Sequence, residues 1–349
     1  MKNKIIFFWE GFPVCALLLT LIKKEYGKNL QIVATKPNVN FPDFELDYPY
    51  LDILWLDKAN DIWNLKDQYS DFNFVIHTGW KHTGWNKYSD YLKKKNNAKL
   101  IFTVDNIFIN SPKQYLGAIY FRIFLKNKYN AVFVPGNRST KFLNFLGMPS
   151  NKIFTGYYGA FEEIYFESSN ILSRNCEFFF IGQLISRKGL IILLEAYKLY
   201  RKKGGNWTLR ISGNGPLEYL CHNLEGVYYD GFLSPKDCTV KMNNSRCLIL
   251  PSNDEHWGTV VCEAAATGMM LLLSNCVGSS DDILRNGING LIFENNSISD
   301  LENKMSLISN WDDKRVSHAS QVSISISKGF NSLSFYNGLI SMIETISYD

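Results

Sequence analysis

Short apolar runs alternate with amphipathic stretches along the whole chain. Runs that predict strands lie at residues 4–9, 30–35, 72–77, 99–104 and 131–136, and again at 176–182, 208–213, 226–233, 247–251, 270–275 and 290–294. Helical patterns lie between several of them. This alternation predicts parallel sheets covered by helices on both faces, an α/β fold. In such sheets, ligands bind beyond the carboxyl ends of the strands.

The strand and helix pattern runs through the chain twice. With 349 residues, the chain is long enough for two domains. The segment 151–163 ends the first pattern, and its Gly156 and Gly159 suit a bend. We therefore predict an N-terminal domain over 1–160 and a C-terminal domain over 161–328. Apolar residues near a 3.6-residue period predict a last helix within 329–349.

Composition indicates a globular protein, with 46% hydrophobic and 20% charged residues. No apolar run approaches the roughly 20 residues that span a bilayer, and the N-terminus lacks the layout of a signal peptide. The seven cysteines are scattered and form no C-x-x-C pair. This pattern favours a reducing compartment, and the cytoplasm is the expected location.

Positive charge is concentrated in the first half of the chain. Residues 1–160 hold 21 Lys and Arg against 12 Asp and Glu, whereas the rest has a balance of −5. A basic half favours an anionic partner, such as the inner face of the cytoplasmic membrane or a diphosphate lipid. Solvated lysines, including the run 93–95, are the alternative explanation. No recognised nucleic-acid module is present, so nucleic acid is not an expected partner.

The stretch 251–268 carries the first candidate site. Turn residues follow a short apolar run, and a helix is then predicted that ends at Gly268. Glu255 lies in the turn and Glu263 in the helix. The start of the helix lies between them, and its free N–H groups form an anion site. This layout suits a nucleotide sugar, although two solvated glutamates would also explain it.

A second candidate site lies in residues 181–197. A strand ends at Gly182, and a helix is predicted to open near Lys188. A cation at a helix N-terminus is unfavourable by roughly 0.3–1 kcal/mol. Two adjacent cations, Arg187 and Lys188, are therefore consistent with an anion bound there.

These motifs resemble a known family. Glu255 and Glu263 form an E-x7-E pattern, which continues into EAAATG and, at 278–293, GSSDDILRNGINGLIF. Together they resemble the donor-binding region of retaining GT-B glycosyltransferases, family four (group 1). The resemblance covers about 176–295 well and the N-terminal half loosely. It implies two Rossmann-like domains whose parallel sheets face each other across a cleft, with the last helix crossing back to the first domain.

The resemblance also implies an activity. A sugar would move, with retention of configuration, from a nucleotide-diphosphate sugar to a hydroxyl of a saccharide or lipid-linked saccharide. No metal or cofactor is implied, and no Asp-x-Asp unit is present. Lys188 would hold the diphosphate, Glu255 the sugar hydroxyls and Glu263 the ribose hydroxyls. Further donor contacts would come from Gly11, Gln183, Arg187, Gly213, Gly215, Phe232, Leu233, Gly258, Thr259 and Val260.

Several positions depart from the family pattern. Gln183 stands where the family usually has arginine, and only Gly11 is present where many members have Gly-Gly. Asp105 stands where the family has a residue that faces the reacting sugar. It would orient the acceptor or stabilise charge at the anomeric carbon, or else cap a helix.

Acceptor candidates come from the first half. His77 and His82 follow a predicted strand, and Trp80 and Trp85 could stack on sugar rings or lie in the core. The H-x4-H spacing is unusual for a metal site.

Two other functions stay open: a sugar-nucleotide-binding subunit without activity, and a sugar-nucleotide epimerase. A nicotinamide dehydrogenase is disfavoured because no G-x-G-x-x-G follows a strand. Bacterial surface-polysaccharide synthesis, such as that of O-antigen, is the expected setting. The donor sugar, its base, the acceptor and the oligomeric state stay undetermined.

Overall fold

The computed structural model describes residues 3–9, 17–35, 49–79, 82–165 and 168–347. The chain divides into two compact units, which are described separately. Unit 1 comprises Met1–Tyr158 and Ser332–Asp349, and unit 2 comprises Gly159–Asn331. The first boundary lies two residues earlier, and the second three residues later, than those drawn from the sequence.

Unit 1 is built on a seven-stranded sheet, and every strand pairing in its described residues is parallel. Across the sheet the strands are β3 (Ile53–Leu56), β2 (Leu30–Thr35), β1 (Ile5–Trp9), β4 (Phe74–Thr78), β5 (Lys99–Thr103), β6 (Ala131–Val134) and β7 (Ile153–Thr155). The order reverses between β1 and β4, as in doubly wound sheets. In this register Phe7 lies opposite Ile32 on one side and Ile76 on the other.

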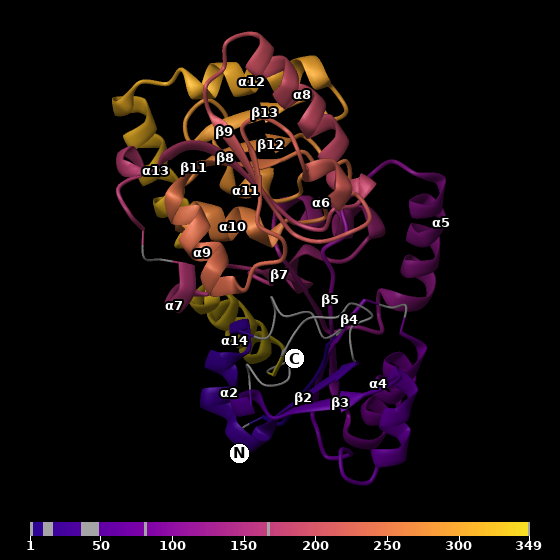
Figure 1. Ribbon diagram of the computed structural model, residues 1–349. Coiled ribbons are helices and arrows are strands. Elements are labelled where there is room, and N and C mark those ends of the chain that lie inside the picture. Colours follow the sequence, from indigo (N-terminus) through magenta and orange to yellow (C-terminus); the bar gives the residue numbers. More distant parts are fainter. Residues whose placement is uncertain (1–2, 10–16, 36–48, 80–81, 166–167, 348–349) are drawn as a thin grey trace. The chain divides into compact units, whose positions relative to one another are not determined.

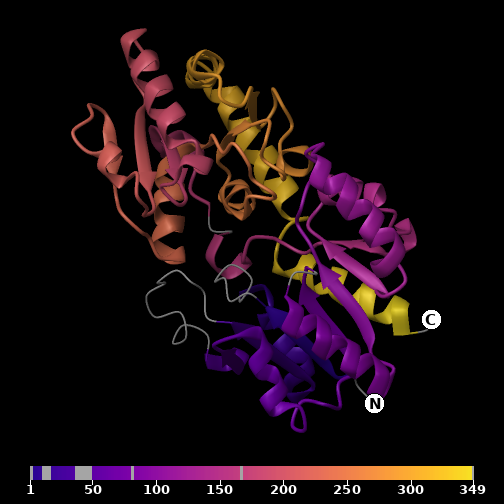
Figure 2. The same cartoon turned by 90° about the vertical axis from the view of Figure 1, so that its right-hand side faces the viewer.

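Helices cover both faces of this sheet because its strands are apolar on both. Ile5, Phe7 and Trp9 belong to one core, while Ile6 and Phe8 belong to the other. The first core is closed by α2 (Thr20–Tyr26) and α14 (Ser332–Ser347), and the second by α4 (Thr83–Asn96), α5 (Pro112–Tyr120) and α6 (Asn137–Leu146). Helix α14, yellow in Figure 2, packs against α2 and against strands β6 and β7 of this sheet. Asn3, just before β1, donates to Ser347 at the end of α14 at 3.4 Å.

Unit 2 repeats the same topology in a six-stranded parallel sheet. Its order is β10 (Val227–Tyr229), β9 (Thr208–Ser212), β8 (Asn175–Ile181), β11 (Ser245–Leu250), β12 (Met270–Ser274) and β13 (Gly290–Phe293). Helices α8 (Leu190–Lys202) and α12 (Ile298–Ser309) cover one face, and α9 (Pro235–Asn244) and α10 (Thr259–Ala266) cover the other (Figure 1). Helix α13 (Asp313–Ser327) packs against α10 and β12. The strand order reverses between β8 and β11.

Shorter elements complete the two units. They are α7 (Glu162–Tyr165), α11 (Ser280–Ile283), a π-helical turn η4 (Phe121–Leu125), and the 3-10 turns η1 (Gly27–Asn29), η2 (Pro49–Leu51), η3 (Ala59–Leu65), η5 (Ser150–Lys152), η6 (Ile171–Ser173), η7 (Ser186–Lys188) and η8 (Glu218–Cys221). Among the helices of the described residues, none has the length and apolar character needed to cross a membrane.

The two segments that connect the units lie side by side at Ala160 and Asn331. The Ala160 N–H donates to Phe330 O at 2.9 Å, and Asn331 Nδ2 donates to Glu162 Oε1 at 2.6 Å. A Cβ on Gly159 would lie 2.6 Å from the backbone of Asn331. A glycine is therefore required where the first connection passes the second.

The sequence-based strand predictions are confirmed for every predicted run, each of which contains a strand. Strands β3 and β7 were not predicted. Both lie at edges of the first sheet and are mostly half-buried, so their sequences lack the long apolar run of a central strand.

Candidate functional site

The loops after β8 and β11 lie at the point where the strand order of unit 2 reverses. In an open parallel sheet, the crevice that binds ligands lies beyond the carboxyl ends of the strands at such a point. The first loop carries Arg187 and Lys188, and the second carries Glu255. The two predicted motifs therefore meet at this crevice, although they are 67 residues apart in sequence.

Lys188 and Glu255 form an ion pair through Lys188 Nζ and Glu255 Oε2. The side chains are only 14% and 11% exposed, so water screens the pair weakly. Ser252, which the sequence analysis did not single out, donates its hydroxyl to the same carboxylate oxygen at 3.1 Å. Its position three residues before Glu255, in the same turn, is the signal that could have identified it. These contacts fix the position of the Glu255 carboxylate beyond the end of β11.

The helix that follows Lys188 begins later than predicted. Lys188 ends the 3-10 turn η7, Gly189 adopts φ +73°, and α8 begins at Leu190. A side chain at Gly189 would meet Pro251 O at 2.0 Å, so a glycine is needed where the two loops touch. Lys188 is thus held beside the β11 loop rather than within the helix.

Arg187 ties the same two loops together. Its guanidinium donates to Asp254 O, and Asn253 N donates to Arg187 O at 2.8 Å. Arg187 and Gln183 are both exposed. Both can therefore reach a ligand in the crevice.

Helix α10 begins beside Glu255. Gly258 caps it with φ +85°, and Thr259 and Val260 form its half-exposed first turn. First-turn N–H groups have no partner inside a helix and favour an anion. The helix ends as the sequence predicts, because Gly268 adopts φ +76° and donates to Ala265 O at 3.0 Å.

The loop after β12 clamps the segment that carries Glu255. Gly278 N donates to Glu255 O at 2.8 Å, and Ser279 N donates to Trp257 O at 3.0 Å. A Cβ on Gly278 would lie 1.7 Å from His256 O. Residues 278 and 279 therefore hold the backbone on both sides of His256 in place.

Glu263 lies on α10 with a strongly perturbed carboxyl group. Burial raises its pKa to about 7, against the effect of a hydrogen bond with Tyr165. The residue still reaches solvent in part. It is close to Cys238 of α9, whose pKa is raised to about 12 by burial and then by the charge of Glu263. Glu263 therefore faces the start of α9, just after Phe232 and Leu233.

Two glycines bring the loop after β9 close to the loop after β8. Gly213 and Gly215 have φ of +133° and +150°, and a Cβ on each would clash with the carbonyl oxygens of Gly182 and Leu184 at 1.8 Å and 2.6 Å. Leu184 N also donates to Asn214 O at 2.8 Å. The two glycines of the G-x-G pattern therefore allow the backbones of the loops after β8 and β9 to approach closely.

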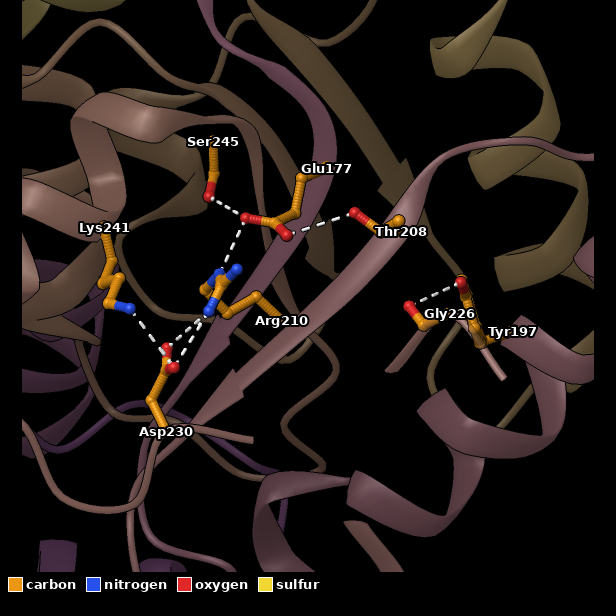
Figure 3. Close-up of polar contacts among 8 residues, drawn as sticks. All are labelled: Glu177, Tyr197, Thr208, Arg210, Gly226, Asp230, Lys241 and Ser245. Carbon is orange, nitrogen blue, oxygen red and sulfur yellow. Dashed lines mark hydrogen bonds and ion pairs between the residues drawn. The ribbon is translucent and has the colours of Figure 1, made fainter. Parts of the chain in front are cut away.

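Phe232 is 47% exposed and Leu233 is half-buried, so Phe232 is not a core residue. A charge network holds Asp230, two residues before Phe232 (Figure 3). Arg210 donates to both oxygens of Asp230 at 2.9 and 3.0 Å, and to Glu177 at 2.9 Å. The buried Glu177 also accepts from Ser245 at 2.7 Å and Thr208 at 3.1 Å, and Lys241 contacts Asp230 at 3.2 Å. By holding Asp230, the network fixes the backbone just before the exposed Phe232.

The candidate site residues of unit 1 differ in burial, and two of them are not described. Gly11 and Trp80 lie outside the described residues. Asp105 follows β5 and is half-buried, and its carboxylate accepts from Tyr158 Oη at 3.5 Å. The next helix, α5, begins seven residues later at Pro112 with Ser111 at its N-cap, so Asp105 does not cap a helix.

His77 does not fit the predicted role of acceptor contact. It is fully buried, with Nδ1 2.8 Å from Gly79 O, and burial lowers its pKa to about 4. The neutral ring lies inside unit 1 near Tyr129, because β4 continues to Thr78 and helices cover both faces of the sheet. Trp85 is also buried, and half-buried His82 lies against it with ring centroids 4.5 Å apart. Of these three side chains, only His82 reaches solvent.

The described residues contain no group of three or more His, Cys, Asp or Glu side chains arranged to hold a metal ion. The polar groups that converge at the crevice are instead a lysine, an arginine, a carboxylate and helix N–H groups. Such a set recognises an anion with hydroxyl groups beside it.

Comparison with known families addresses the same part of the chain. Residues 161–321 match the family described as glycosyl transferases group 1. Unit 2 therefore resembles a glycosyl transferases group 1 domain. The match includes both loops of the crevice, with Lys188, Glu255 and Glu263.

Curated relatives agree with this assignment. An uncharacterized glycosyltransferase of Haemophilus influenzae is 28% identical over 135 residues, 37% of this chain and 38% of that protein. The capsular polysaccharide biosynthesis glycosyltransferase CapM of Staphylococcus aureus is 22% identical over 272 residues, 70% of each chain. The match thus spans about two fifths of the first relative.

Solved structures extend the similarity to the whole fold. A glycosyltransferase from Rickettsia africae has a TM-score of 0.77 and 17% identity, with 98% of each chain covered. The Anabaena protein Alr3699/HepE, solved in complex with UDP-glucose, has a TM-score of 0.75 and 16% identity, with 100% of each chain covered. The two Rossmann-like units therefore form the GT-B fold.

Proposed function

We propose that this chain is a retaining glycosyltransferase that binds a nucleotide-diphosphate sugar in the crevice of unit 2. The observation that carries the proposal is the Lys188–Glu255 pair beside the start of α10, at the switch point of the sheet. A cation and helix N–H groups suit a diphosphate, and the adjacent carboxylate suits sugar hydroxyls. The complex of Alr3699/HepE with UDP-glucose supports a uridine nucleotide as the donor.

Charge that develops on the leaving diphosphate would be stabilised by Lys188 and by the first-turn N–H groups of Gly258, Thr259 and Val260. An ammonium group has three donors, so Lys188 can keep its contact with Glu255 while it donates to a phosphate oxygen. Arg187 would add a second cation. Gln183 would donate a neutral hydrogen bond where the family usually supplies arginine.

Carboxylates would orient the two ends of the donor. Glu255, fixed by Lys188 and Ser252, would accept from hydroxyls of the transferred sugar. Glu263 would accept from the ribose, and an ionised carboxylate accepts such bonds better than a protonated one. Phe232 and Leu233 would flank the base, and Gly213 and Gly215 would let the backbone approach the nucleotide.

Transfer would need no protein nucleophile. The bond from the anomeric carbon to the diphosphate oxygen breaks, and a bond to the acceptor oxygen forms on the same face. The departing phosphate oxygen takes the acceptor proton. Asp105, held near Tyr158, is the candidate carboxylate on the acceptor side. No metal or cofactor enters this scheme.

The acceptor is proposed to be a saccharide or lipid-linked saccharide in bacterial surface-polysaccharide synthesis, of which O-antigen assembly is one setting. The names of CapM and of the lipopolysaccharide outer core galactosyltransferase WaaB support this class. The proposed location is the cytoplasm, with peripheral contact between the basic first half of the chain and the inner face of an anionic membrane.

Substitution of Lys188 tests the proposal. Lys188→Ala should lower transfer about a hundredfold or more, since one electrostatic contact to the leaving group is lost. Lys198→Ala is the matched control, because Lys198 pairs with Glu195 on the exposed face of α8. Initial rates are measured as release of nucleoside diphosphate in the presence of acceptor. A Lys188→Ala rate equal to that of the control would remove Lys188 from the mechanism.

Gln183, an exposed neutral side chain where the family usually has arginine, favours a second candidate: a sugar-nucleotide-binding subunit without activity. Nucleoside diphosphate released only when acceptor is present would support the transferase. Binding without release would support the inactive subunit. Conversion of the donor sugar without acceptor would indicate an epimerase.

A further inference from the structure

Helix α5 and the turn η4 form one continuous helical segment, residues 112–125, with two apolar sides. Its inner side is ordinary, since Ala118, Phe121 and Leu125 are buried in the second core of unit 1. An outer side in contact with water would normally be polar. Here it is not.

The outer side carries five large apolar residues at helical spacing, which we call the α5 face. Their exposed fractions are 69% for Leu116, 55% for Ile119, 51% for Tyr120, 65% for Ile123 and 62% for Phe124. The spacing i, i+3, i+4, i+7 and i+8 places them on one stripe. Single exposed apolar residues are common, but a contiguous stripe marks a site of interaction.

Neighbouring apolar residues extend the α5 face. Phe108 and Ile109, in the preceding loop, are 41% and 61% exposed. The rings of Phe108 and Tyr115 both contact Phe145 of α6, at centroid distances of 4.6 and 5.2 Å. The loop is therefore held against the helix and continues its apolar surface.

The charge around the α5 face has one sign. Residues 106–161 contain seven Lys and Arg and no Asp or Glu. Lys113 and Arg122 are exposed on the helix, and Arg122 is anchored by hydrogen bonds to the carbonyls of Phe145 and Leu146. A second copy of this chain on the same face would oppose cations with cations, which disfavours self-association. An anionic lipid surface complements both the charge and the apolar stripe.

We propose that the α5 face is the membrane-docking surface of this protein. The segment would lie in the plane of an anionic bilayer, with Leu116, Ile119, Ile123 and Phe124 among the acyl chains and Lys113, Arg122 and Lys126 among the headgroups. This deepens the peripheral contact included in the proposed function by assigning it to one segment. It would bring unit 1 to the surface where a lipid-linked acceptor resides.

Vesicle flotation tests this assignment. The full-length protein should float with phosphatidylcholine vesicles that contain phosphatidylglycerol, and much less with phosphatidylcholine alone or at high salt. The double variant Leu116→Gln/Ile123→Gln should bind the anionic vesicles at least about tenfold more weakly. Leu307→Gln is the matched control, because Leu307 is 55% exposed on α12 of unit 2. The charge variant Lys113→Glu/Lys126→Glu should lose the preference for phosphatidylglycerol.

Two further measurements separate the outcomes. Thermal unfolding and transfer to a soluble acceptor should not change in the double variant, so a loss of flotation cannot come from misfolding or from failure of the donor site. Wild-type protein that stays unbound, or a double variant that floats like the control, would overturn the proposal. So would light scattering that shows a dimer converted to a monomer by the double variant, since the α5 face would then bind a second copy.

Discussion

Glu263 shows how one side chain can couple pH to stability. Its folded-state pKa of about 7 lies above the ordinary value of 4.5 because the carboxyl is buried. Between these pH values the folded chain keeps a proton that the unfolded chain has released, so the free energy of unfolding falls as pH rises. Glu263→Gln should remove this decrease, about 2–3 kcal/mol between pH 5 and 8. Urea unfolding across that range measures it.

The control for this prediction is Glu195→Gln, which alters an exposed carboxylate paired with Lys198. It should leave the pH profile of the wild type intact. An unchanged profile in Glu263→Gln would mean that burial does not perturb this carboxyl group. The raised pKa could not be read from the sequence, since E-x7-E specifies spacing but not the packing of Tyr165 and α9 around Glu263.

The contact between Lys188 and Glu255 marks a similar limit at the residue scale. The sequence predicted each residue separately: Lys188 from the start of a helix, and Glu255 from a turn. Their ion pair depends on β8 and β11 being neighbours, and this adjacency arises only from the strand order.

At the scale of elements, backbone contacts between loops position the candidate site. Gly278 lies against His256 O with no room for a side chain. Gly278→Ala should shift the loop that carries Glu255, lowering the free energy of unfolding by about 1–3 kcal/mol and weakening nucleoside diphosphate binding. Thermal unfolding and binding titrations measure the two effects.

Gly329→Ala provides the comparison, because a Cβ there has an ordinary contact at 3.5 Å. It should change stability by less than about 0.5 kcal/mol. Equal behaviour of the two variants would show that the loop after β12 does not clamp Glu255.

The sequence was most informative for buried central elements. Runs such as 270–275 are apolar on both faces, and only a central parallel strand buries both. Edge strands β3 and β7 lack this signal. The burial of His77 was also missed, because the predicted run ends at this residue whereas β4 continues to Thr78.

At the scale of the whole molecule, unit 1 depends on the last segment of the chain. Leu339 of α14 is fully buried in the core formed by the first strands, whereas Leu333 of the same helix is 49% exposed. Leu339→Ala should destabilise unit 1 by about 2–5 kcal/mol, and Leu333→Ala by less than about 0.5 kcal/mol. Hydrogen exchange should then accelerate in β1 and β6 of Leu339→Ala while β8 and β11 stay protected, since each unit has its own sheet and core. Equal acceleration in all four strands would show that the two units unfold as one.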